Sequence, residues 1–156
     1  MIVRRFGFYQ YACLVWCINI VLVILSYFIV GLVYSVIILF PAVFIALGAM
    51  SWLSKKEKIG FSQVMARSAA WVKIIALTSI LYSLVNFFVC LVLLSEGGPH
   101  IDNGVYCVWN HGFVREITRP EYEALLKIEG RMFVGHILAF AALPVVFFSA
   151  RKNSNK

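Results

Sequence analysis

The sequence has few charged residues for its length. Only 13% of its 156 residues are Asp, Glu, Lys or Arg, whereas an average soluble domain carries about 25%. A soluble domain of this size has a surface large enough to need many more charges. This scarcity argues against a soluble enzyme, a disordered chain and a nucleic-acid-binding module. The remaining class is an integral membrane protein, in agreement with 62% hydrophobic residues and a mean hydropathy of +0.89.

Charge is almost missing from four stretches that are long enough to cross a hydrocarbon core about 30 Å thick, which takes about 20 helical residues. The predicted spans are 11–30, 33–53, 70–94 and 132–150. No charged residue lies between Arg5 and Lys55, so the first two spans form one long run, with a turn near Gly31. The sequence therefore predicts an all-α membrane protein, with a four-helix transmembrane bundle in a single membrane domain of residues 1–156.

The basic residues predict how the chain is oriented. Ten Lys and Arg residues lie before the first span, near the connection of the second and third spans, or after the fourth span. These segments contain one acidic residue, Glu57, so their net charge is +9. The connection 95–131 carries four basic and six acidic residues, a net charge of −2. By the positive-inside rule, both termini are cytoplasmic and residues 95–131 lie outside the cell inner membrane, in the periplasm or extracellular space. The overall charge of +7 then reflects topology, and no nucleic-acid partner is expected.

No Asp or Glu residue lies inside any of the four spans. Ion-coupled transporters usually place an ionisable group there, so a small transporter or channel is a less favoured reading. The third span instead carries polar residues on one helical face, which we name the polar seam: Ser79, Tyr82, Ser83, Asn86 and Cys90. We expect the seam to face the bundle and to form hydrogen bonds between helices, with Asn86 paired to His136 of the fourth span. A proton-linked role for His136, or a permeation path along the seam, is the alternative.

Paired cysteines and metal-ligand spacings are also missing. Cys107 is the only cysteine in the connection 95–131, which argues against a thiol oxidase and against a loop built on disulfides. Haem b would need a second histidine facing His136, and the outer histidines lack the spacing of a zinc site. We therefore expect no catalytic residue, no metal and no cofactor, and a protein that is not an enzyme.

The connection 95–131 contains the signals of a small folded module. Gly97, Gly98 and Pro99 end the third helix. Two runs rich in β-forming residues, 105–109 and 113–117, flank a short segment with glycine, which is typical of a β-hairpin.

A helix is expected to follow this hairpin. Thr118 and Glu121 have the spacing of a capping box, so a helix is predicted to begin there and to continue into the fourth span. Its outer apolar stripe would pack against the hairpin. Gly130 and Gly135 are the expected weak points of this helix.

The C-terminal third resembles uncharacterised small multi-span proteins of bacterial inner membranes. The resemblance is carried by Asn110-His111-Gly112, Arg115-Glu116-Ile117-Thr118, Glu121-Tyr122, Arg131 and Gly135-His136. The aromatic-rich run that follows the Gly-His pair in those proteins is absent here beyond Phe140. The resemblance implies a bacterial origin and a shared outer hairpin, and it implies no known activity.

Two functions are favoured by this layout. The first is a non-enzymatic protein that binds a protein partner, similar in layout to bacterial immunity proteins against membrane-targeting toxins. It would occlude an incoming toxin through the polar seam or through the outer loop. The candidate contact residues of the loop are Trp109, Asn110, His111, Arg115, Glu121 and Tyr122. The second is an accessory or assembly subunit of a membrane complex, whose partner helices would meet the seam and the strip Ala42, Ala46 and Ala49. The expected partners are membrane lipid and a protein, and a homo-oligomer is compatible with both functions.

Overall fold

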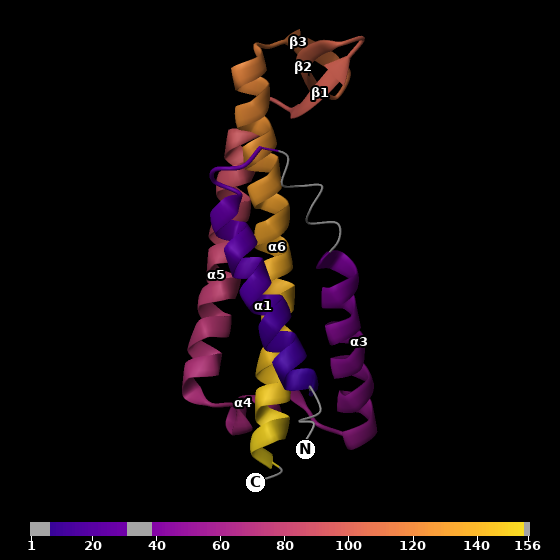
Figure 1. The fold of residues 1–156 in the computed structure, drawn as a ribbon, viewed down its shortest axis with the longest axis vertical. Helices are drawn as coiled ribbons and strands as arrows, with labels where there is room; N and C mark the ends of the chain where they lie inside the picture. Colours follow the sequence, from indigo (N-terminus) through magenta and orange to yellow (C-terminus); the bar gives the residue numbers. More distant parts are fainter. Residues whose placement is uncertain (1–6, 31–38, 155–156) are drawn as a thin grey trace, which may run out of the picture.

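The computed structural model describes residues 7–30 and 39–154, and most of these residues are helical (Figure 1). The elements are α1 (Phe8–Leu25), α3 (Leu39–Glu57), α4 (Phe61–Arg67), α5 (Ala70–Leu93), β1 (Gly98–Asp102), β2 (Val105–Asn110), β3 (Phe113–Glu116) and α6 (Arg119–Ser154). The strands form one small sheet at one end of the helices.

Three of the described helices, α1, α5 and α6, are long and apolar enough to cross a membrane. The predicted third span agrees with α5 to within one residue. The first predicted span, 11–30, is displaced along the chain: α1 already begins at Phe8 and ends at Leu25, and the Ser26 hydroxyl donates to the carbonyl oxygen of Val23 (2.6 Å). α3 is long enough but is not among the three, since Lys55 and Lys56 in its last turn lower its hydropathy. The start of the predicted second span, 33–38, lies outside the described residues.

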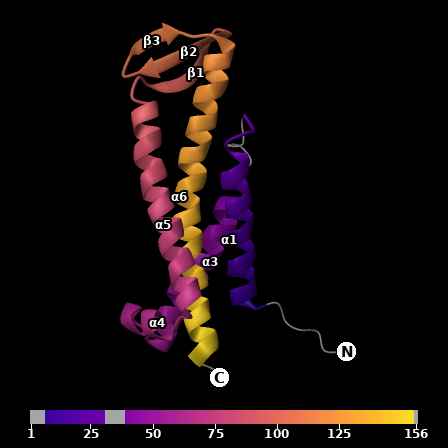
Figure 2. The same ribbon diagram turned by 90° about the vertical axis from the view of Figure 1, so that its left-hand side faces the viewer.

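α6 is the central helix of the molecule. It packs against α1, α3, α4 and α5, and Figures 1 and 2 show α1 and α5 lying along it. Nearly all of its residues from Val134 to Ala150 are buried or half-buried. The Ala strip of α3 is turned inward, because Ala46 is buried and the Ala42 carbonyl accepts a hydrogen bond from the Tyr11 hydroxyl (3.1 Å). The strip therefore packs within this chain.

The segments that carry most of the basic residues lie at the end of the bundle opposite the sheet (Figure 1). There, the ring of Phe8 at the start of α1 stacks on Phe148 of α6, with ring centroids 5.6 Å apart. The guanidinium of Arg151 forms an ion pair with Glu57 of α3 (2.8 Å). The short helix α4, which the sequence did not predict, also lies at this end. The beginning of α1, the connection of α3 to α5 and the end of α6 are thus neighbours.

The outer module contains a three-stranded antiparallel sheet, in the order β1-β2-β3. The predicted hairpin is present as β2 and β3, but β1 was missed because Gly98 and Pro99 are poor strand formers. Both connections are two-residue turns with positive φ angles: 48° and 84° at Asn103 and Gly104, and 47° and 96° at His111 and Gly112. Such turns match the twist of antiparallel strands. A third strand also explains how a hairpin that would be marginal alone is held.

Candidate functional site

The polar seam faces the bundle interior, as its spacing predicts. The indole Nε1 of Trp16 donates to Ser79 Oγ (3.2 Å). Ser83 Oγ lies 2.7 Å from the carbonyl oxygen of Ser79 on α5 and 2.5 Å from that of Gly135 on α6. The Ser83 hydroxyl therefore connects the two helices. Asn86 Nδ2 donates to the carbonyl oxygen of Arg131 (2.9 Å). These hydrogen bonds make the seam a helix-packing surface.

The predicted pair of Asn86 and His136 is wrong. His136 Nδ1 lies 2.6 Å from the carbonyl oxygen of Met132, one turn earlier in α6, and its ring meets Phe87 edge-on with centroids 4.7 Å apart. The side-chain amide of Asn86 instead lies against Gly135, where an added Cβ atom would be 2.6 Å from Asn86 Nδ2. Gly135 is therefore a point of close contact between α5 and α6, and α6 continues unbroken through both Gly130 and Gly135.

Arg131, one of the residues that carry the resemblance, lies at the contact of α6 with Tyr27, and this contact was not predicted. Its guanidinium lies over the ring of Tyr27, 4.7 Å from the centroid, and its Nε is buried without a hydrogen-bond partner within the described part of the chain. Tyr27 in turn places its hydroxyl 3.2 Å from that of Tyr82, on α5. The available signal was position alone, since Arg131 is the last charge before the apolar stretch of α6.

The sheet is attached to the outer turns of α6 by one of its two faces. The rings of Tyr106 and Tyr122 lie 4.9 Å apart, which joins β2 to α6. Successive residues of a strand point to opposite faces. Trp109 therefore points away from the Tyr106 face, together with its cross-strand partner Val114. Both side chains are 55% exposed.

We name this second face of the sheet the outer face. By the register of the strands, it comprises Val105, Cys107, Trp109 and Val114 with Gly98 and the polar residues His100, Asp102 and Glu116. Cys107 is buried, so the exposed apolar side chains of this face are Val105, Trp109 and Val114. Phe113, the first residue of β3, pairs with Asn110 and therefore belongs to the opposite face, although 83% of its surface is exposed. An apolar centre with polar residues around it is the usual anatomy of a protein-binding surface.

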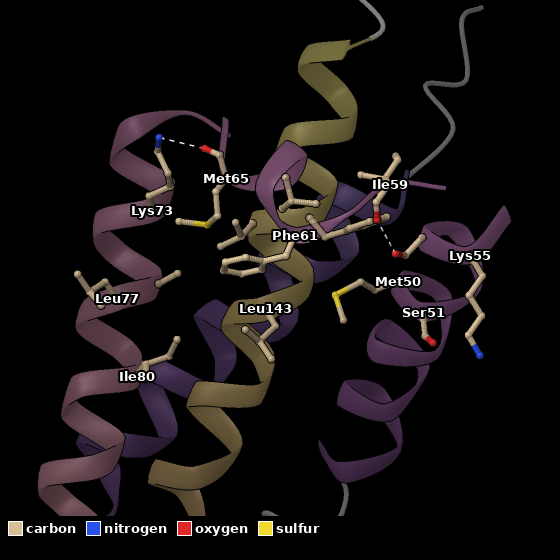
Figure 3. A pocket seen from close by; sticks show the side chains of 15 residues that line it. Met50, Ser51, Lys55, Ile59, Phe61, Met65, Lys73, Leu77, Ile80 and Leu143 are labelled. Carbon is tan, nitrogen blue, oxygen red and sulfur yellow. Dashed lines mark hydrogen bonds between the residues drawn. The ribbon is translucent and has the colours of Figure 1, made fainter. Parts of the chain in front are cut away.

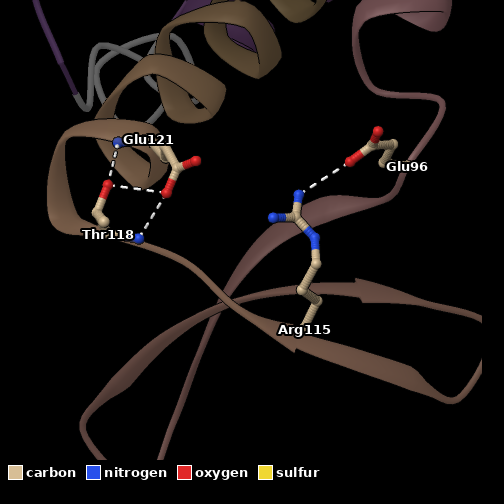
Figure 4. A network of polar contacts seen from close by, with 4 residues as sticks. All are labelled: Glu96, Arg115, Thr118 and Glu121. Carbon is tan, nitrogen blue, oxygen red and sulfur yellow. Dashed lines mark hydrogen bonds and ion pairs between the residues drawn. The ribbon is translucent and has the colours of Figure 1, made fainter.

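The six candidate contact residues do not gather on one face. Trp109 lies on the outer face and His111 at the exposed tip of the β2–β3 turn. Asn110, Arg115 and Tyr122 belong to the side of the sheet that meets α6. Figure 4 shows Arg115 in an ion pair with Glu96 (2.9 Å), just after α5.

Val114 was not among the predicted contact residues of the loop. Its place on the outer face depends on the strand register and on which face meets α6. Neither could be read from the pattern of residues before β1 and its pairing were known.

Glu121 has a structural task at the start of α6 (Figure 4). Its Oε2 accepts hydrogen bonds from the Thr118 backbone N–H (2.7 Å) and hydroxyl (2.8 Å), while the Glu121 N–H points back to Thr118 Oγ1 (3.4 Å). The predicted capping box is thus confirmed. Hydrogen bonds to the charged form hold the pKa of the Glu121 carboxyl below its ordinary value, first through the backbone N–H of Thr118.

This capping box predicts that the start of α6 depends on pH. Because the pKa of Glu121 is lowered in the folded protein, its stabilising effect is complete above the ordinary carboxyl pKa of about 4.3 and is lost as pH falls through the lowered value. Amide hydrogen exchange at residues 118–122, corrected for intrinsic rates, should speed up below about pH 4. In Glu121→Gln this acid-dependent step should be absent. Equal acid dependence in both proteins would contradict the assignment.

At the sheet, His100 and Cys107 are cross-strand partners, and the Cys107 thiol donates to the His100 carbonyl oxygen (3.4 Å). Among residues 7–30 and 39–154, no group of three His, Cys, Asp or Glu side chains is placed to hold a metal ion.

Comparisons with family models, with curated proteins and with solved structures find no match to this chain.

Proposed function

We propose that this chain is a multi-pass protein of the bacterial inner membrane that binds a protein partner through the outer face of its sheet. In this proposal α1, α3, α5 and α6 are the four spans, both termini are cytoplasmic and the sheet lies outside. The position of the basic residues at the end opposite the sheet supports this orientation.

The proposal rests on one observation: Trp109 and Val114 are direct cross-strand neighbours, and both side chains are exposed. Tryptophan is enriched among the residues that dominate binding energy, above all when apolar neighbours surround it. The sheet is attached to the turns of α6 that precede the apolar stretch, so these side chains face water instead of lipid. A partner that covers them would gain the burial of both side chains.

The specific form that we propose is an immunity protein, whose outer face occludes an incoming membrane-targeting toxin. An accessory or assembly subunit of a membrane complex is the second candidate, and it would use the same face on a neighbouring subunit. A small transporter or channel is less well supported. The buried hydroxyl and amide groups of Ser79, Ser83 and Asn86 already have partners on α1, α5 or α6, which favours a packing role over a permeation path.

Site-specific photo-crosslinking in living cells tests the proposal. A crosslinking residue at position 114, on the outer face, should capture a discrete protein that mass spectrometry can identify. The same residue at position 124, an exposed site on the outer turns of α6, is the control. Capture that is equal at both positions, or absent at 114, would count against the outer face as the binding site.

The Trp109→Ala change should weaken this capture at least tenfold, because truncation of a central tryptophan typically costs 2 kcal/mol or more. The affinity of the identified partner for purified wild-type and variant protein measures the effect. If the partner is a toxin, the variant should also lose protection in cells. If it is a complex subunit, the complex should fail to assemble. An unchanged affinity would move the binding surface away from Trp109.

A further inference from the structure

An apolar groove of about 570 Å³ lies between α3, α4, α5 and α6, at the end of the bundle opposite the sheet (Figure 3). Its walls include Met50, Phe61, Met65, Leu77, Ile80 and Leu143. Two cations, Lys55 from α3 and Lys73 from α5, also line it, and its lining contains no acidic residue. The volume lies within the range of about 300–1,000 Å³ that is typical of ligand sites.

The depth of the groove follows from the aromatic residues beside it. Trp52 on α3 and Trp71 on α5 are 59% and 57% exposed, and Lys56 places its ammonium 4.8 Å from the centre of the Trp52 ring. Exposed tryptophans next to lysines are typical of the level of the lipid headgroups. Ile80 lies two turns further along α5 than Lys73, about 10 Å deeper. The groove thus runs from the headgroup level into the hydrocarbon.

Of the two lysines, Lys73 is placed to bind a phosphate group. Figure 3 shows the Lys73 ammonium donating one hydrogen bond to the carbonyl oxygen of Met65 (3.2 Å), which leaves two of its three protons for an anion. Lys55 is exposed on α3, and its ammonium points away from the groove and from Lys73 (Figure 3). The nearest acidic residue in sequence, Glu57, is already paired with Arg151. Basic pockets between membrane helices on the cytoplasmic side are suited to anionic headgroups.

We infer that this groove binds one anionic glycerophospholipid, with an acyl chain along its apolar walls and the phosphate held by Lys73. The inference rests on the membrane location of the protein and does not require the outer face to bind a partner. An apolar groove at this depth would otherwise have to be filled by bulk lipid, which has no preference of charge. The ammonium of Lys73 makes the groove a site that selects an anionic headgroup.

Native mass spectrometry of the full chain in lipid nanodiscs tests this inference. With equal amounts of phosphatidylglycerol and phosphatidylcholine, the protein should retain phosphatidylglycerol at least threefold more often. Lys73→Gln should remove this preference and leave phosphatidylcholine binding unchanged. Lys58→Gln is the matched control, because Lys58 is an exposed neighbour that does not line the groove. The nanodisc offers both lipids on both faces, so the result does not depend on orientation.

A second variant tests the acyl-chain wall. Leu77→Trp should fill the groove and reduce retention of both lipids at least threefold, with the far-UV circular dichroism of the parent protein. If this variant fails to fold, the comparison of the lysine variants alone decides. Equal retention of the two lipids by the parent protein would overturn the inference. So would an unchanged preference in Lys73→Gln, or a dimer with no bound lipid, which would mean that a second copy covers the groove.

Discussion

Gly135→Val is expected to lower the free energy of unfolding by about 2–4 kcal/mol, since it adds side-chain volume to a packed contact and displaces a hydrogen-bonded amide. At this position, the Cβ atom alone would lie 2.6 Å from Asn86 Nδ2. The Asn86 side chain cannot swing away freely, because its Nδ2 donates to the Arg131 carbonyl oxygen. Any movement of α6 would also disturb the contact between Ser83 and the Gly135 carbonyl oxygen. The variant should therefore separate α5 from α6.

Equilibrium unfolding in mixed micelles, followed by circular dichroism, measures this loss. Gly48→Val on α3 is the matched control, because a Cβ atom there meets nothing within 4 Å. It should change the free energy of unfolding by less than about 0.5 kcal/mol, as is usual at surface sites. Combining Gly135→Val with Asn86→Ala makes room for the new side chain and should recover part of the loss, as a double-mutant cycle would show. Additive losses in the double variant would mean that the two positions are not in contact.

Gly97→Ala is expected to unfold the outer sheet and leave the helices intact. Gly97 has a φ angle of +123°, which an alanine adopts only with strain. Its new Cβ atom would also collide with the backbone of Trp109 and lie 2.8 Å from Val108 Cγ1. The strain costs about 1–3 kcal/mol before the collision is counted, which is large for a sheet of three short strands.

Hydrogen exchange resolved by peptide is the measurement for this second prediction. Amides of β1, β2 and β3 should lose at least tenfold in protection, while those of α5 and of α6 beyond Met132 should be unchanged. The adjacent change Gly98→Ala is the control, because a Cβ atom there has open space and the φ angle is not in the positive range. If both variants kept the protection of the parent sheet, the tight approach of Gly97 to β2 would be refuted.

Local signals predicted much of the helical structure. The spacing of Thr118 and Glu121 gave the start of α6, and hydropathy gave α5, because capping and apolar length act over a few neighbouring residues. The inward direction of Ser83 and Asn86 followed from helical periodicity alone. The partner of Asn86 did not, since it depends on the axial offset of α5 against α6.

The outer module was only half predictable for a similar reason. Asn103-Gly104 is a strong hairpin signal, but Gly98 and Pro99 before it hid the first strand. Without β1 the sequence does not indicate which face of β2 is covered by Tyr122 and which is left open. The groove at the other end was not predictable, because it depends on how the consecutive helices α3, α4 and α5 pack against α6, which is distant in sequence.

The length of α6 has an electrostatic consequence for the outer face. α6 rises about 15 Å between Met132, where its apolar stretch begins, and Tyr122, on which the sheet packs. Headgroups extend only about 5–7 Å beyond the hydrocarbon, and the Debye length at physiological ionic strength is about 8 Å. In the proposed orientation, the field of an anionic membrane surface is therefore largely screened at the outer face. The salt dependence of partner association would then report on His100, Asp102 and Glu116 themselves.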